Sequence, residues 1–96
     1  MLRPKATVQY MSIIVHPRVF ERHPDLSLPD VEAAVLGAIT IRVRLGTDPL
    51  EHVGVGLNQA GQLLQWIGNR MPGVESWFIF HAMRATRNVL IELGLK

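Results

Sequence analysis

The sequence predicts an α+β fold in which two N-terminal helices precede a four-stranded antiparallel meander sheet and a C-terminal helix follows it. Hydrophobic residues recur at helical spacing up to Leu36 and then alternate with polar residues from Ala38 onward. Short turn sequences such as Pro72-Gly73 separate the alternating segments. Because such short turns join antiparallel neighbours, we expect a meander with the helices packed on one of its faces.

Two helices are predicted ahead of the strands. Pro17 suits the first position of a helix, and Pro24 ends it because a residue before proline avoids the helical conformation. Ser27 is an N-cap residue whose capping box would include Asp30, and Gly37 is a natural C-terminal cap. The predicted helices therefore cover residues 17–23 and 28–36.

Four strands and a last helix follow. The alternation of apolar and polar residues, together with a more apolar third segment, predicts strands over residues 38–45, 51–58, 62–70 and 76–84. Thr86 is an N-cap residue for a helix over residues 87–93, which Gly94 would close. The chain thus ends on a helix that begins directly after the fourth strand.

The two faces of this sheet are expected to differ. If the apolar residues of the first two strands face the helices, the other face carries Thr40, Arg42, Arg44, His52, Gly54 and Gly56. With the phenylalanines of the fourth strand in the core, the same open face would carry Trp77, Ile79, His81 and Met83. Cations, glycines and an aromatic ring suit single-stranded RNA, which binds through charge and base stacking. The alternative is a solvated face with a few structural residues.

Length and composition predict a single domain over residues 11–96. Residues 1–10 lack periodicity and are expected to be an extension, disordered or non-native, since Met11 can itself be a start. A hydrophobic fraction of 48% with 19% charged residues is typical of a folded globular chain. No apolar run reaches the roughly 20 residues that cross a bilayer, so we expect a cytoplasmic protein without a membrane partner.

The end of the fourth strand gathers residue types used in phosphate chemistry. His81 can act as a general acid or base because histidine titrates near neutral pH. Arg84 and Arg87 can hold a phosphate and stabilise charge that develops on it, helped by the free amides of the last helix. The alternatives are a structural histidine and a surface pair of arginines.

Further candidates lie elsewhere in the chain. Arg22 and His23 can add a second cationic or proton-transfer group, and the alternative is a helix-end histidine packed under the sheet. Weaker candidates for contacts to RNA or phosphate are Arg42, Arg44, His52 and Arg70. The sequence contains no cysteine, no metal-ligand motif, no P-loop and no nucleophile elbow. We therefore expect no metal and no cofactor, and any enzyme mechanism would be metal-independent.

Two short segments carry a family resemblance. Arg22-His23-Pro24-Asp25-Leu26-Ser27 leads into Val31-Glu32-Ala33-Ala34, where family members read Lys-His-Gly-Ile-Ser-Phe-Glu-Glu-Ala. His81-Ala82-Met83-Arg84-Ala85-Thr86 stands where they end the fourth strand with Ser-Ala-Arg-Lys-Ala-Thr. On these motifs and the order of elements, residues 16–94 resemble the BrnT family of toxins from type II toxin–antitoxin modules, a branch of the RelE-like ribonuclease fold.

The resemblance implies a metal-independent endoribonuclease that halts growth by cleaving RNA and is neutralised by a ribbon-helix-helix antitoxin. By position, His23 matches the family histidine and Arg84 matches the basic residue before Ala-Thr. The chain departs from the family at Met83, where the family has arginine, and at His81, where it has serine. In the mechanism we expect, His81 moves a proton to or from the ribose or the leaving oxygen, while Arg84 and Arg87 stabilise the transition state.

Two other functions fit the same sequence. The chain can be a non-catalytic module that binds RNA or a protein with the same fold. It can also be a small interaction protein that forms a homodimer through its sheet, since the third and fourth strands are apolar on both sides. The residues expected at that interface are Trp66, Trp77 and Ile79.

Overall fold

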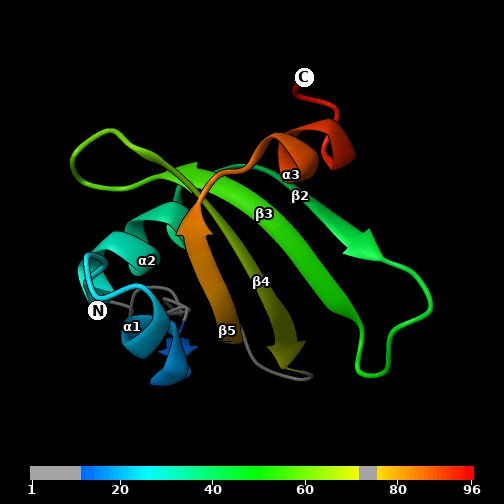
Figure 1. The fold of residues 1–96 in the computed structure, drawn as a ribbon. Helices are drawn as coiled ribbons and strands as arrows, with labels where there is room; N and C mark the ends of the chain where they lie inside the picture. Colours follow the sequence, from blue (N-terminus) through cyan, green and yellow to red (C-terminus); the bar gives the residue numbers. More distant parts are fainter. Residues whose placement is uncertain (1–11, 72–75) are drawn as a thin grey trace, which may run out of the picture.

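A mixed five-stranded β-sheet with three helices makes this an α+β protein; the computed structural model describes residues 12–71 and 76–96 (Figure 1). In chain order the elements are β1 (Ser12–Val15), α1 (Arg18–Arg22), α2 (Leu28–Leu36), β2 (Ala38–Arg44), β3 (Glu51–Leu57), β4 (Leu63–Met71), β5 (Ser76–Arg84) and α3 (Arg87–Glu92). The strand order across the sheet is β1-β5-β4-β3-β2. The extension expected over residues 1–10 lies outside the described residues.

The predicted helices and the antiparallel meander of β2 to β5 are present, with β5 and α2 at their predicted bounds. Local capping explains the accuracy at α2, where Ser27 and Asp30 form the expected capping box. Thr86 caps α3 by accepting a hydrogen bond from the Val89 N–H at 3.4 Å. None of the helices in the described part of the chain has the length and hydrophobicity needed to cross a bilayer.

The four-stranded prediction is wrong in number, because a fifth strand, β1, joins the edge of the sheet. It pairs in parallel with β5, with Ile13 opposite Trp77 and Val15 opposite Ile79. Two helices and three strands lie between β1 and β5 in the chain, so no short turn in the sequence indicates the pairing. A four-residue apolar run has too few residues to show a strand period by itself.

The prediction that all helices pack on one face of the sheet is wrong, because they lie on both faces. Helices α1 and α2 cover one face, which we call the α2 face, and bury the larger core cluster around Trp66. On the opposite face, called the α3 face, Val89 and Leu93 at the C-terminal end pack against Val53 and Val55. The α3 face is covered only in part, because α3 has six residues and the sheet has five strands.

The predicted facing of β2 and β3 is also wrong. Ile41 pairs with Gly54 and Arg42 pairs with Val53, so the apolar set of β2 shares a face with the glycines of β3. Gly56 lies under α2, where an added Cβ would stand 2.1 Å from the Ala34 carbonyl oxygen. Gly56 therefore admits α2, and Gly54 admits the Trp66 ring, where the prediction had placed RNA. Because side chains alternate along a strand, a one-residue change of register is enough to exchange the two faces.

The predicted facing of the fourth strand, which is β5 in the structure, is wrong as well. Trp77 and Ile79 lie in the core under α1 and α2, whereas Phe78 and His81 lie on the α3 face. A bulge between Ile67 and Gly68 in the pairing with β5 leaves Phe80 as an extra residue. The residues proposed for a dimer interface, Trp66, Trp77 and Ile79, are each at most 3% exposed and are core residues of the chain itself.

Candidate functional site

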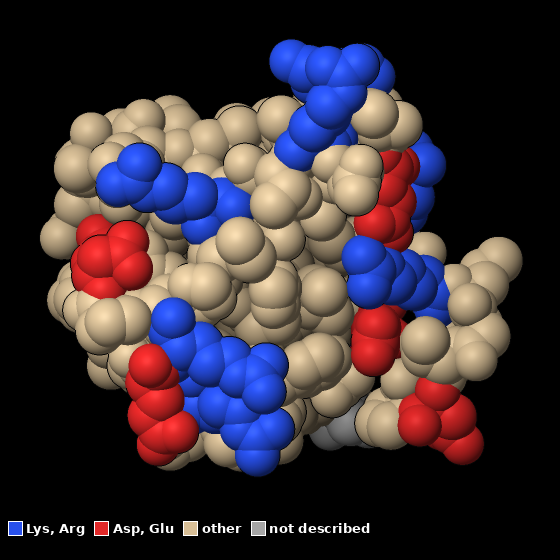
Figure 2. All heavy atoms as spheres, in the orientation of Figure 1, with Lys and Arg blue, Asp and Glu red and all other residues tan. Residues whose placement is uncertain are grey.

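A hollow of about 350 Å³ opens on the α3 face, and we call it the main hollow. Its lining residues are His16, Arg18, Arg22, Arg44, Glu51, Ile67, Phe80 and His81. A smaller hollow of about 90 Å³, the side hollow, is lined by Arg18, Val19, Arg22, His23, Phe80, His81 and Ala82. The two hollows share four lining residues and so form one continuous site. Figure 2 shows basic side chains distributed around uncharged surface on one side of the molecule.

Elements that are distant in the sequence supply the positive charge of this site. Arg18 and Arg22 are one helical turn apart on α1, so both can point the same way. Arg44 comes from the end of β2, on the other side of the hollow. Glu51, the first residue of β3, adds the carboxylate. The two arginines of α1 can therefore hold an anion in the hollow.

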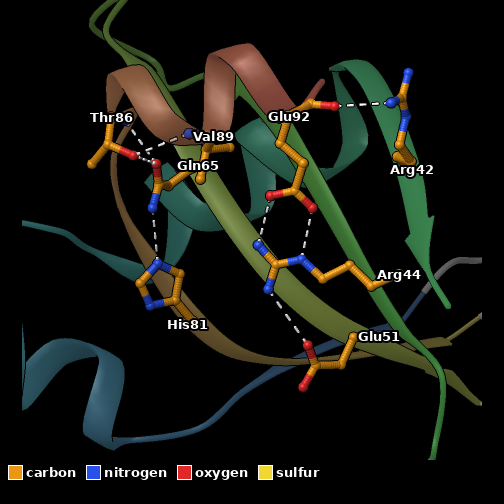
Figure 3. Close-up of polar contacts among 8 residues, drawn as sticks. All are labelled: Arg42, Arg44, Glu51, Gln65, His81, Thr86, Val89 and Glu92. Carbon is orange, nitrogen blue, oxygen red and sulfur yellow. Dashed lines mark hydrogen bonds and ion pairs between the residues drawn. The ribbon is translucent and has the colours of Figure 1, made fainter. Parts of the chain in front are cut away.

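Arg44 is held in place by two carboxylates (Figure 3). It donates to Glu92 through Nε and Nη2, both at 2.8 Å, and its Nη1 lies 3.6 Å from a carboxylate oxygen of Glu51. The hydrogen bonds to Glu92 raise the pKa of Arg44 above its ordinary value. Arg42 is also bound to α3, since its Nη1 donates to the Glu92 carbonyl oxygen at 2.9 Å. The expected RNA contacts of Arg42 and Arg44 are thus replaced in part by contacts to α3.

His81 lies at the junction of the two hollows. Its Nε2 is 3.1 Å from Nε2 of Gln65, and the Gln65 Oε1 accepts from the N–H and the hydroxyl of Thr86 at 2.7 and 2.9 Å (Figure 3). Burial lowers the pKa of His81, and the positive charges of His23, Arg44 and Arg22 lower it further. The His81 ring is therefore neutral at pH 7, in a site rich in cations.

The structure separates Arg84 and Arg87 from His81. Arg84 is opposite Leu64, a core residue of the α2 face, whereas His81 is opposite Ile67, which packs on the α3 face. Cross-strand partners share a face, so the side chains of Arg84 and His81 leave the sheet on opposite sides. Arg87 is exposed at the start of α3 and lines neither hollow. His81, Arg84 and Arg87, which were predicted to form one catalytic cluster, therefore do not lie together.

His52 and Arg70 form a separate group on the α2 face. The His52 ring meets Trp77 edge to face with centroids 5.1 Å apart, and the Arg70 guanidinium lies 5.1 Å from the centre of the same ring. Burial and then the charge of Arg70 lower the pKa of His52. Both side chains thus pack against Trp77, and neither lines the hollows.

The remaining two candidates, Arg22 and His23, lie at the hollows. Arg22 lines both hollows and His23 lines the side hollow. Sequence reasoning missed Glu51, His16, Arg18, Phe80 and Gln65. The i,i+4 spacing of Arg18 and Arg22 was a readable signal. Nothing in the sequence pointed to Gln65, because its role depends on which strand residues it faces across the sheet.

No metal site accompanies these residues in the part of the chain that the structure describes, where no three His, Cys, Asp or Glu side chains are grouped to hold an ion. Comparisons with protein-family models, with curated proteins and with solved structures found no match for the chain. A functional conclusion therefore has to come from the geometry of the two hollows and from the chemistry of their side chains.

Proposed function

We propose that the chain is a metal-independent endoribonuclease that acts as the toxin of a type II toxin–antitoxin module, with the RelE-like fold of the BrnT family. The observation that carries the proposal is the main hollow, where cations from α1 and β2 surround a carboxylate and a neutral histidine. Arginine binds phosphate through paired donors, and a carboxylate or imidazole can move protons near neutral pH. RNA supplies both a phosphate and a nucleophile, its own 2′-hydroxyl.

The reaction proposed is an internal transesterification. The ribose 2′-oxygen forms a bond to phosphorus, the bond from phosphorus to the 5′-oxygen breaks, and the products carry a 2′,3′-cyclic phosphate and a 5′-hydroxyl. A base in the hollow takes the 2′-hydroxyl proton, and the leaving oxygen takes a proton from a hollow side chain or from water. The titratable groups available are His16, Glu51 and His81. Arg18 and Arg22 stabilise the extra negative charge of the transition state.

The module would act in the cytoplasm, and its expected partners are RNA and an antitoxin of the ribbon-helix-helix type. These partners follow from the resemblance of the two motifs around His23 and Arg84. Support from the structure is restricted to His23, which lies at the side hollow, while Arg84 lies on the other face. Arg22, which lines both hollows together with His81, takes the phosphate-binding role that the sequence had suggested for Arg84.

A second candidate, a non-catalytic module that binds single-stranded RNA, is favoured by the pairing of Arg44. Two carboxylates already neutralise this cation, so it is a weaker stabiliser of charge than a free arginine would be. The cations of α1 and the half-buried ring of Phe80 would remain for backbone contacts and base stacking.

Incubation of the full chain with a fluorescent single-stranded RNA in excess chelator tests the proposal. We expect cleavage with 2′,3′-cyclic phosphate ends, and a loss of about a hundredfold or more in the folded His81→Ala variant. His52→Phe, which removes a histidine from the opposite face, is the matched control and should retain cleavage. RNA binding without cleavage would support the second candidate, and a chain that neither binds nor cleaves RNA would refute both.

A further inference from the structure

We propose that Gln65 is a positioning residue that fixes which ring nitrogen of His81 carries the proton. The neutral ring is held with its hydrogen on Nδ1, so His81 donates a hydrogen bond to the substrate phosphate and is not the base. This inference rests on the proposed function for its catalytic part, while the tautomer is a property of the protein alone.

The orientation of the Gln65 amide is set by a backbone group. The Thr86 N–H lies 2.7 Å from Oε1 of Gln65, and an N–H can only donate, so this end of the amide must be the oxygen. The Thr86 hydroxyl lies 2.9 Å from the same oxygen and accepts from the Val89 N–H at 3.4 Å. Its single hydrogen is therefore directed to Gln65. Figure 3 shows this chain of contacts leading from α3 to the sheet.

The consequence for His81 follows from the other end of the amide. Nε2 of Gln65 has two hydrogens and cannot accept, and it lies 3.1 Å from Nε2 of His81. The ring nitrogen must then present its lone pair, so the hydrogen of the neutral ring is on Nδ1. In Figure 3 the second ring nitrogen is on the side of the imidazole turned away from Gln65.

Reversing this arrangement would unpair buried groups. Gln65 is 4% exposed, so a rotated amide would turn its NH₂ group toward the Thr86 N–H with little water to compensate. Protonation of His81 would likewise set an N–H against the NH₂ group of Gln65. Arg22 of α1, His23 directly after it and Arg44 of β2 lower the pKa of the ring, and they oppose a charged ring in the same way.

The Nδ1–H tautomer of His81 decides which side chain donates and which accepts a proton in the proposed reaction. A ring without a lone pair on Nδ1 cannot take the 2′-hydroxyl proton, but it can donate to a non-bridging oxygen as charge develops there. His16 already accepts the Arg18 N–H on its Nδ1 at 3.0 Å, so the carboxylate of Glu51, in the same hollow, is then the acceptor of that proton. The bond from phosphorus to the 2′-oxygen forms, the bond to the 5′-oxygen breaks, and the 5′-oxygen takes its proton from water.

Nitrogen–proton correlation NMR on the histidine-labelled full chain tests the tautomer directly. The His81 signals are identified by their loss in His81→Asn, and above the His81 midpoint we expect a neutral ring protonated on Nδ1. A ring protonated on Nε2 would overturn the proposal, whether or not the protein cleaves RNA. This measurement needs no substitution of Gln65 and so does not depend on the folding of a variant.

Gln65→Glu tests the influence of the amide. A carboxylate there accepts from both Thr86 and His81, so the midpoint of His81 should rise by about one to two pH units. Gln59→Glu adds the same charge at an exposed loop position and should leave the midpoint unchanged. An unchanged His81 midpoint in folded Gln65→Glu would contradict the positioning role.

Cleavage at a pH between the two measured His81 midpoints then separates donor from base. There Gln65→Glu holds His81 protonated, and a protonated ring still donates from Nδ1, so cleavage should stay within the same order of magnitude. If His81 were the base, the same variant would lose about a hundredfold or more. A wild-type chain that does not cleave RNA would refute the proposed function and the donor role, while the NMR result would still decide the tautomer.

Discussion

Two hydrogen bonds of 2.8 Å join the Arg44 guanidinium to the Glu92 carboxylate and so bind α3 to the edge strand β2. The same guanidinium reaches Glu51 at 3.6 Å, on the floor of the main hollow. The contact therefore has two effects. It holds α3 against the sheet, and it sets the position of the only β2 arginine that lines the site in the described part of the chain.

Glu92→Gln should lower the free energy of unfolding by about 0.5–1 kcal/mol, because both side chains are about one third exposed and solvent screens the pair. The Arg44 hydrogen bond lowers the pKa of Glu92, so the paired carboxylate adds stability above its ordinary pKa near 4.5. That contribution is lost as the pH falls through the lowered pKa. Urea unfolding at pH 7 and pH 3 should show the difference between wild type and variant shrinking at the lower pH. Glu21→Gln, on the exposed side of α1, is the control, and an equal loss in both variants would contradict a specific role for Glu92.

Gly56→Ala should destabilise the protein by about 1–3 kcal/mol or prevent folding, because the new methyl group would meet the Ala34 carbonyl oxygen of α2. Leu57→Ala, at the exposed next position of β3, should change stability by about 0.5 kcal/mol or less. Thermal or urea unfolding measures both variants. Equal stability of Gly56→Ala and wild type would mean that this face of β3 is open, as the sequence alone had suggested.

Arg22→Ala should weaken binding of single-stranded RNA, whereas Arg84→Ala should not, since Arg22 lines both hollows and Arg84 lines neither. Loss of one phosphate contact should also reduce the slope of log affinity against log salt by about 0.7. Fluorescence anisotropy over a series of salt concentrations gives both quantities. A weaker affinity in Arg84→Ala and an unchanged one in Arg22→Ala would move the RNA site to the α2 face.

Wild-type stability should decline as the pH falls below about 6.5. Burial and the charge of Arg70 lower the pKa of His52, and burial lowers that of His81, so the unfolded chain binds more protons in this range. Each group can contribute at most about 1.4 kcal/mol per pH unit. His52→Phe keeps a ring against Trp77 and should make the decline between pH 7 and pH 5 shallower. A slope identical to that of wild type would mean that His52 does not titrate differently in the folded state.

Local signals accounted for much of the fold. The capping box of Ser27 and Asp30, the cap at Thr86 and the change of hydrophobic period each involve residues close in sequence, and the elements they predicted are present. Of the predicted site residues, Arg22 and His23 lie together at the side hollow, because both come from one helix end. Arg84 was selected by its closeness to His81 in the sequence, which alternation along a strand turns into separation by the sheet.

The sequence by itself determined the three helices and the strands β2 to β5, because propensity, capping and periodicity act over a few residues. Only the tertiary structure decided the rest: the parallel pairing of β1 with β5, the face on which Gly56 lies, and the contact of Gln65 with His81. The physical reason is register. Pairing of distant strands is chosen by the packing of the whole core, and a shift of one residue moves every side chain of a strand to the other face.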